Sequence, residues 1–209
     1  MLPPTLPLFP LPNVVLFPNV FLPLHIFEPR YREMVADALS GDRLIGMVLL
    51  RPGWEPHYEG RPDVYEVGCA GLITFSEQHA DGRYNIVLRG FEKFRIVGEQ
   101  HDRSYRIGHV VPLMEEPTEE EKVRIRAERR RLEALLVPAA QEKGSEPKVP
   151  PWVADEDLVN ALAQYLDLEP VEKQALLERE GLVARCRSLI DLLEMRVMVA
   201  KTPWNTGAH

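Results

Sequence analysis

Near its start the chain carries Leu6-Pro7-Leu8-Phe9-Pro10-Leu11 and, after further apolar runs broken by proline, His25-Ile26-Phe27-Glu28-Pro29-Arg30-Tyr31. Each proline removes a backbone donor and fixes φ, so these runs are expected to form short edge strands and bends rather than a long helix. After Phe27 the pattern changes, because Pro29 suits the first helical position and apolar residues follow at helical spacing up to Gly41. We therefore expect strands followed by a short amphipathic helix.

Short apolar segments separated by turn residues continue to about residue 113. The clearest turn is Asp81-Gly82, which lies between two β-rich segments and predicts a hairpin. Many short strands with such turns are typical of a barrel-like β structure. The segments expected to form strands are 44–50, 64–67, 72–75, 84–88, 94–97 and 105–111.

The remainder of the chain has helical patterns. Thr118 with Glu121 three residues later is a capping-box pattern, which predicts a helix that runs to about Val137 and stops at Pro138. Three more helices are expected to pack as a small bundle. They are predicted to begin after a cap at Asp155, at Pro170 and at Leu182.

These patterns predict an α+β fold in two parts. Residues 1–117 are expected to form a mixed β-barrel or sheet with one packed helix, and residues 118–200 a helical subdomain. The polar segment at about 138–151 contains glycine and proline and is expected to be a flexible loop, and 201–209 a tail.

The charge balance argues against a general nucleic-acid binder. The 209 residues include 25 basic and 32 acidic side chains, a formal net charge of −7, whereas phosphate contacts need a clustered positive surface. A basic cluster between Lys122 and Arg131 is the exception, but Glu120 lies four residues before Arg124 and Arg129 four before Glu133. This spacing favours an ion-paired helix face.

Cysteine and histidine offer no recognisable catalytic or metal site. Cys69 and Cys186 are far apart in sequence, so neither a disulfide framework nor a paired-cysteine metal site is expected, and a reducing compartment fits. No two histidines are spaced as metal ligands, and no cofactor motif is present. The prolines before residue 13 interrupt any signal-peptide core, so a cytoplasmic protein without a membrane segment is expected.

The segment His25 to Tyr31, with the strand-proline-strand sequence before it, resembles the N-terminal substrate-binding domain of Lon proteases. Four later motifs agree with that family in order: Leu44 to Leu50, Tyr65 to Ile73, Asp81 to Tyr84, and Gly90 to Ile96. The helical segment from Tyr165 to Glu178 is also similar to the helical part of Lon N-terminal regions. The resemblance implies a PUA-like barrel with the helix after Pro29 packed on it.

A full Lon protease also carries an ATPase and a peptidase domain, and their motifs are missing here. No Gly-Lys pair occurs, so the phosphate-binding loop of an ATPase is not present. Lys143 and Ser145 are the only neighbouring lysine and serine, and they lie in the expected flexible loop, where a nucleophile and its base cannot be held together. We therefore expect a stand-alone Lon-domain protein, outside the catalytic peptidase class, with no catalytic residues.

Aromatic residues in loops are the candidates for contact with a partner, because a core role is hard to assign to them. The Pro/Gly-rich segment 51–62 carries most of these residues, and the N-terminal bends and the segment after the polar loop carry the others. The candidate polypeptide-binding residues are Trp54, His57, Tyr58, Phe17, Phe21 and Trp152.

The resemblance implies a non-catalytic module that binds unfolded or exposed apolar polypeptide, with polypeptide clients or a protease or ATPase subunit as partners. The oligomeric state is left open. Two alternatives remain: an RNA-binding protein, suggested by the PUA-like fold, and a small hydrolase built around Cys69. The first would show salt-sensitive affinity and the second a reactive thiol.

Overall fold

The computed structural model describes residues 2–58, 60–141, 150 and 152–201. The chain forms two compact units. The first contains the chain up to Met114 together with Asn160–Glu178, and the second contains Glu115–Val159 and the residues from Arg179 on. The division therefore differs from the split after residue 117 that the sequence suggests, because part of the helical region belongs to the unit that holds the strands.

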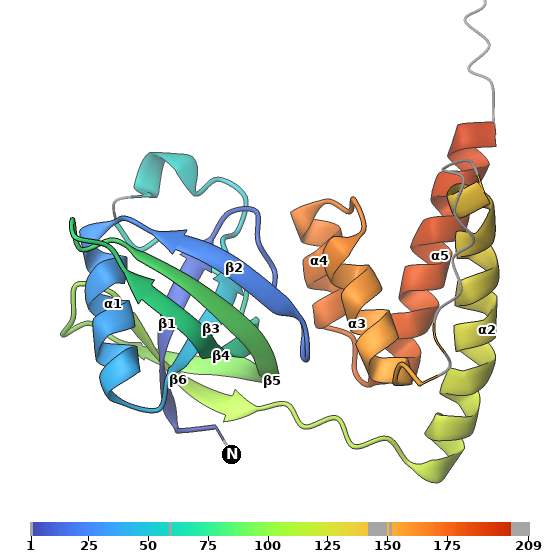
Figure 1. The fold of residues 1–209 in the computed structure, drawn as a ribbon, viewed down its shortest axis with the longest axis horizontal. Helices are drawn as coiled ribbons and strands as arrows, with labels where there is room; N and C mark the ends of the chain where they lie inside the picture. Colours follow the sequence, from blue (N-terminus) through green and yellow to red (C-terminus); the bar gives the residue numbers. More distant parts are fainter. Residues whose placement is uncertain (1, 59, 142–149, 151, 202–209) are drawn as a thin grey trace, which may run out of the picture. The chain divides into compact units, whose positions relative to one another are not determined.

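Six strands build the first unit, in the order β2-β5-β4-β3-β1-β6, and β6 also pairs with β5 (Figure 1). This second pairing closes five of the strands into a ring and leaves β2 on its outside. Only β1 and β3 are parallel, so the barrel is mixed, as expected for the α+β class. The strands are β1 (Thr5–Leu11), β2 (Phe21–Ile26), β3 (Leu44–Leu49), β4 (Val67–Gln78), β5 (Tyr84–Gln100) and β6 (Arg106–Pro112).

The length of β5 makes closure possible. Its first half pairs with β2, and its second half, from Phe94 to Gln100, pairs with β6, while β4 lies along the other edge. β-bulges at Ala70/Gly71, at Ile73/Phe75 and at Ile96/Gly98 mark the places where the register shifts. Bulges bend a strand and increase its twist, which is what a small barrel requires. The separate segments 84–88 and 94–97 are one continuous strand for this reason.

The barrel interior is narrow and is filled around Phe94. The fully buried Phe94 and Leu8 form a cluster with Leu2, Leu6, Val48, Ala70 and Val110. Gly46 and Gly68 face the Phe94 ring, and a Cβ at these positions would lie 2.9 Å and 2.7 Å from its Cζ. Small residues on the neighbouring strands are therefore needed to admit one large ring.

Helix α1 (Pro29–Ser40) begins at the predicted proline and ends before Gly41. It lies beside β1 and buries one face, made of Tyr31, Met34, Val35 and Ala38 (Figure 1). The Tyr31 ring packs on Phe9 of β1, with centroids 4.5 Å apart. The amphipathic helix predicted from the spacing is confirmed.

The bend between β1 and β2 folds back onto β5. Asn19 donates its backbone N–H to the Gly90 carbonyl (2.9 Å), and Gly90 donates to the Val20 carbonyl (2.8 Å). Two amide side chains of α3 (Asp155–Tyr165) fix the same bend: Phe17 N–H donates to Gln164 Oε1, and Asn160 Nδ2 donates to the Pro18 carbonyl. The bend is therefore a fixed part of the first unit.

Helix α4 (Pro170–Leu177) belongs to this unit too. Its buried Gln174 donates from Nε2 to the Val67 carbonyl at the start of β4 (2.9 Å). Lys173 Nζ donates to the Gln164 carbonyl at the end of α3 (2.6 Å). These polar contacts explain why residues 160–178 cluster with the strands.

In the second unit α2 (Glu119–Gln141) and α5 (Leu182–Lys201) run side by side (Figure 1). The predicted capping box is present: Glu121 N–H donates to Thr118 Oγ1, and Thr118 N–H donates to Glu121 Oε2. The fully buried Arg185 of α5 donates to both carboxylate oxygens of Glu115, at 2.8 Å and 2.6 Å. A buried charge requires such a partner.

Three details of the helical region differ from the sequence predictions. Helix α2 continues past Pro138, since a proline near a helix end removes a single hydrogen bond. Asp155 is the first residue of α3, and its carboxylate forms an ion pair with Arg129 at 2.8 Å instead of acting as the cap. The three helices expected to form a bundle are divided between the units: α4 and the end of α3 belong to the first unit and α5 to the second. Of the loop predicted at 138–151, residues 142–149 and 151 lie outside the described residues, as does the tail after Lys201.

Within the described part of the chain, no helix has the length and apolar character needed to cross a membrane.

We predict that Gly90→Ala destabilises the protein. A Cβ at Gly90 would overlap the Phe17 carbonyl, which is backbone and cannot rotate away. The free energy of unfolding should fall by about 1–3 kcal/mol, measured by urea unfolding followed by circular dichroism. Gly41→Ala is the matched control, because its Cβ would meet only ordinary contacts at 3.7 Å and 3.9 Å. Equal stability of the two variants would contradict the prediction.

Candidate functional site

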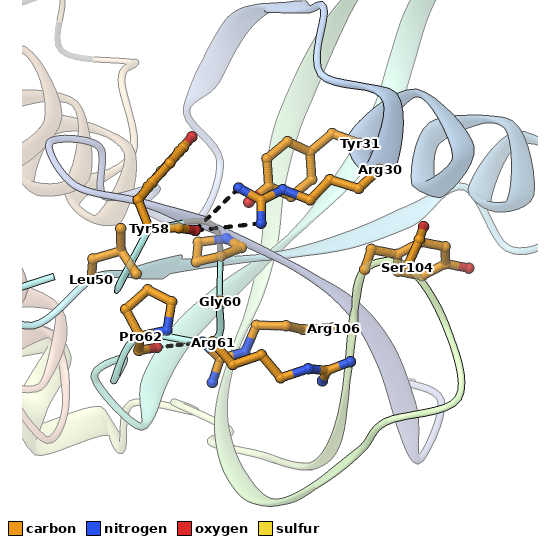
Figure 2. Close-up of a pocket in the computed structure, with 11 residues that line it drawn as sticks. Arg30, Tyr31, Leu50, Tyr58, Gly60, Arg61, Pro62, Ser104 and Arg106 are labelled. Atoms are coloured by element: carbon orange, nitrogen blue, oxygen red, sulfur yellow. Dashed lines mark hydrogen bonds between the residues drawn. The ribbon is translucent and has the colours of Figure 1, made fainter. Parts of the chain in front are cut away.

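The loop between β3 and β4 is held by the residues that open α1. Glu28 Oε1 accepts a hydrogen bond of 2.5 Å from the Tyr58 hydroxyl, and Glu28 Oε2 accepts one of 3.1 Å from Arg30 Nε. The Tyr58 carbonyl in turn accepts from the Arg30 guanidinium at 3.4–3.5 Å (Figure 2). Burial, reinforced by the bond to Glu28, raises the pKa of Tyr58. The segment that indicates the family therefore also anchors the aromatic loop.

Arg30 lies between two aromatic rings. Its guanidinium carbon is 4.8 Å from the centroid of Tyr31 and 5.1 Å from that of Tyr58. Trp54 packs edge-on against the Tyr58 ring, with centroids 5.5 Å apart. A cation held between π-faces and paired with a carboxylate is strongly restrained. Tyr58 is thus held by contacts with Glu28, Arg30 and Trp54, although it lies in a loop.

Beneath this arrangement lies a cavity of about 270 Å³ in the first unit (Figure 2). Residues of α1, of the β3–β4 loop and of the start of β6 surround it, and three of them are arginines. No aspartate or glutamate is among the described residues that line it. The lining consists of Pro10, Arg30, Tyr31, Leu50, Tyr58, Gly60, Arg61, Pro62, Ser104, Tyr105 and Arg106.

Carboxylates also bond to Tyr105 and Arg106 on the other side of the cavity lining. Arg106 donates two bonds to Glu99, at 2.5 Å and 2.9 Å, and a third to the Pro62 carbonyl (Figure 2). The Tyr105 hydroxyl donates to Asp37 Oδ2 of α1 at 2.7 Å. Burial and this bond raise the pKa of Tyr105 to about 12. Hydrogen bonds to side chains and to a main-chain carbonyl therefore restrain Tyr105 and Arg106 in the cavity wall.

A different part of the first unit exposes apolar side chains. Phe21 on β2, Phe75 on β4 and Phe91 on β5 are 51%, 52% and 46% exposed. The register places Pro23 opposite Val87 and Val87 opposite Phe75, so one row crosses three strands. We call the outward side of β2, β5 and β4 the phenylalanine face. Large exposed apolar groups gathered on one face are a feature of binding sites.

The structure places the six residues predicted from the sequence in four different surroundings. Trp54, His57 and Tyr58 remain together in the loop, with His57 exposed in the short 3₁₀ helix Glu55–His57. Phe17 is fully buried and so presents no surface. Phe21 lies on the phenylalanine face, and Trp152, 82% exposed, belongs to the second unit.

Sequence reasoning did not find Phe75, Phe91 or the arginines of the cavity. Phe75 and Phe91 lie in segments rich in strand-forming residues, but the bulges beside them, which decide their outward orientation, are visible only in the strand register of the structure. The sequence gives no sign that Arg30 and Arg106 lie near each other, because they line one cavity only when β6 closes the barrel and α1 packs beside it.

Ion pairs engage several of the basic side chains of α2. Lys122, Arg124 and Arg129 of α2 pair with carboxylates of the same helix. Arg131 instead pairs with Glu194 of α5 at 2.7 Å. Such pairing neutralises most of the α2 cations that could have contacted the phosphates of a nucleic acid.

Both cysteines are fully buried. Cys69 lies in β4 with no exposed surface, so a substrate cannot reach its sulfur. Burial raises the pKa of the Cys186 thiol to about 12, which disfavours the reactive thiolate. The hydrolase alternative therefore has no support in the described residues.

The first unit is a small mixed β-barrel closed by a long bent strand, with one helix at its side and a helical extension. Comparison with known proteins identifies this class more closely. The sequence model of the ATP-dependent protease La (LON) substrate-binding domain matches residues 5–195. The chain belongs to this family, which confirms the resemblance found in the sequence.

Two solved structures share the fold. The N-terminal domain of the Mycobacterium avium complex Lon protease superimposes with a TM-score of 0.67 over 91% of this chain and 98% of that one, at 19% identity. The Lon N-terminal domain protein from Xanthomonas campestris gives a TM-score of 0.57, covering 95% and 99%, at 23% identity.

Curated relatives include Lon protease 2 of Myxococcus xanthus, 29% identical over 209 residues, and Lon protease 2 of Syntrophobacter fumaroxidans, 30% identical over 186. The alignments cover 96% and 85% of this chain but 24% and 22% of those proteins. The chain thus spans about a quarter of the length of these relatives.

We predict a pH-dependent contribution from Tyr105. Removing its bond to Asp37 by Tyr105→Phe should lower the free energy of unfolding by about 1.5 kcal/mol near neutral pH. The phenol ionises at about 10 when unfolded and about 12 when folded, so ionisation favours the unfolded state between these values. The difference between native protein and variant should be complete below pH 10 and disappear as the pH rises towards 12. Urea unfolding at a series of pH values measures it, and a difference that persists above pH 12 would contradict this.

Proposed function

We propose that this domain is a non-catalytic polypeptide-binding module whose phenylalanine face binds exposed apolar segments of unfolded or partly folded chains. The observation that carries the proposal is the exposure of Phe21, Phe75 and Phe91, each about half accessible, on one side of three paired strands. Burial of such rings by a partner is favourable by about 25 cal/mol per Å² of apolar area. Aromatic side chains dominate the energetics of protein interfaces.

Polar side chains on the same strands border this face. His25 Nδ1 lies 2.7 Å from Asn85 Oδ1, and Asn85 Nδ2 donates to Glu77 at 3.4 Å, so one polar row crosses β2, β5 and β4. Arg89, opposite Phe21, donates to Asn19 at 3.3 Å. An apolar centre with a polar rim is the usual anatomy of a protein interface.

Contact by side chains is favoured over addition of a strand to the free edge of β2. Along an antiparallel pair, alternate residues direct their main-chain groups to the partner strand. Val20 accepts from Gly90 N–H and therefore faces β5, so the main-chain groups of Phe21, Pro23 and His25 point to the free edge. Pro23 has no N–H to offer there, and the Phe21 carbonyl already accepts from the Tyr165 hydroxyl at 3.0 Å. A proline in an edge strand opposes pairing with a further chain.

The proposal includes the absence of catalysis by this domain, a cytoplasmic location, and a protease or ATPase subunit as a further partner. It is supported by the match to a substrate-binding domain and by the buried cysteines. The proposal does not extend to activities located in the other three quarters of the length of these relatives.

The test is a Phe75→Ser/Phe91→Ser variant. We expect its affinity for a fluorescein-labelled, reduced and carboxymethylated model protein to fall at least about tenfold, because two anchoring rings are lost. Fluorescence anisotropy measures the dissociation constant, and circular dichroism checks the fold. Val97→Ser is the control, since Val97 is an exposed apolar side chain in the other half of β5.

Unchanged affinity in the double variant would contradict the proposal. A Trp54→Ala/Tyr58→Ala variant then decides whether the loop carries binding. If only this loop variant loses affinity, the polypeptide site is the aromatic loop rather than the phenylalanine face.

A further inference from the structure

Two histidines lie at one end of the phenylalanine face. His25 of β2 is in the outward row that also holds Phe21 and Pro23, and Phe27 follows directly after the strand with 61% exposure. The rings of His25 and Phe27 have centroids 6.3 Å apart and planes inclined by only 27°. His79 comes directly after β4, and its ring centroid lies 6.1 Å from that of His25. The two imidazoles, here called the histidine pair, therefore extend the aromatic surface past the end of β2.

Hydrogen bonds define which nitrogen of His25 carries the proton. Asn85 Nδ2 donates to Glu77 Oε2 at 3.4 Å, so Asn85 presents its Oδ1 to His25. This amide oxygen lies 2.7 Å from His25 Nδ1, and an amide oxygen can only accept, so the hydrogen is on Nδ1. A neutral imidazole carries a single N–H. His25 Nε2 is therefore the nitrogen that takes up a proton when the ring becomes charged.

His79 holds a ring nitrogen away from water. Its Nε2 is buried and has no hydrogen-bond partner among the described residues. A protonated imidazole has an N–H on both nitrogens, so the charged form of His79 must contain a buried N–H without an acceptor. An unmade hydrogen bond of a charged group is costly, and water supplies an acceptor only when the ring turns out of its place beside His25. Protonation thus disfavours the arrangement of the rings that the structure shows.

The charged groups near the histidine pair come from three elements. They are Glu77 of β4, Asp81 and Arg83 of the hairpin turn, and Arg32 and Glu33 of α1, which line a hollow together with Gly82 of that turn. Asp81 is paired with Arg83 at 2.7 Å, and Glu33 accepts from Ser104 Oγ at 2.7 Å. Glu77 is bonded to Asn85. These carboxylates already have partners, so a proton on either imidazole adds a positive charge to this end of the face.

We propose that the histidine pair makes binding by the phenylalanine face depend on pH: apolar polypeptide binds while both imidazoles are neutral and is released when they take up protons. The inference rests on the function proposed above. A segment that covers His25 and Phe27 removes their rings from water, which costs far more for an imidazolium than for a neutral ring. Two imidazolium ions with ring centroids 6.1 Å apart would also repel each other. Since binding then requires release of a proton, affinity falls as the pH falls.

The experiment measures the dissociation constant of the full chain for one apolar peptide at pH 7.5, 6.5 and 5.5 and constant ionic strength. The peptide is amidated, contains no histidine or acidic residue, and carries tetramethylrhodamine, whose fluorescence does not change in this pH range. Fluorescence anisotropy should show affinity falling about tenfold from pH 7.5 to pH 5.5, the change that release of one proton from a group titrating at about pH 6.5 produces. Circular dichroism at each pH checks the fold.

Glutamine variants test the residues, because glutamine is polar and takes up no proton in this range. In the His25→Gln/His79→Gln variant the affinities at pH 7.5 and pH 5.5 should agree within about twofold. His25 is exposed, so His25→Gln keeps the fold, and its reduced pH dependence is informative by itself should the double variant unfold. His101→Gln is the matched control, because His101 is an exposed histidine that follows the far end of β5, and it should retain the full tenfold change.

Three results would overturn the inference and leave the proposed function intact. These are equal affinity at pH 7.5 and pH 5.5, a pH dependence that persists in the double variant, and an equal loss of pH dependence in the His101 and His25 variants. Absence of binding at pH 7.5 has a different meaning, because it overturns the proposed function and the inference with it.

Discussion

Closure of the barrel by β5 is the constraint on which the first unit depends. One strand must pair with β2, β4 and β6 along its length, and it does so by bending at bulges around the fully buried Phe94. The glycines of β3 and β4 leave room for that ring. The bulges also decide which side chains point outwards: Phe75 is half exposed although Ile73, two residues before it, is buried, and Phe91 lies at the bulge opposite Ala70 and Gly71. The exposed face and the packed interior are two consequences of the same strand geometry.

The start of α1 links fold and surface. Pro29 begins the helix, the residues after it bury one face on the barrel, and Glu28 and Arg30 reach the β3–β4 loop. The same short segment thus orders a loop about 30 positions away in the chain and forms one wall of a cavity. Two of the three arginines there are paired with carboxylates, Arg30 with Glu28 and Arg106 with Glu99, and the third, Arg61, is exposed.

Charge pairing has a related role in the second unit. A basic helix in an acidic protein invites an assignment to nucleic-acid binding, but four of its cations pair with glutamates of α2 and α5 and with Asp155. These four are Lys122, Arg124, Arg129 and Arg131. Exposed pairs of this kind contribute little stability individually. The Arg185–Glu115 pair differs, because Arg185 is fully buried. If either partner were removed, water could not readily stabilise the charge that remains.

Local chemistry was sufficient to predict the helix after Pro29, the hairpin at Asp81-Gly82, the capping box at Thr118 and the α+β class. Each depends on residues a few positions apart, so the sequence by itself determined them. It also indicated the family, since motif order survives where identity is low. The division of the helices between two units, the burial of Phe17, the engagement of Tyr58 and the cavity were decided only by the tertiary structure. The physical reason is that these features depend on contacts between segments far apart in the chain, which form only when the barrel closes.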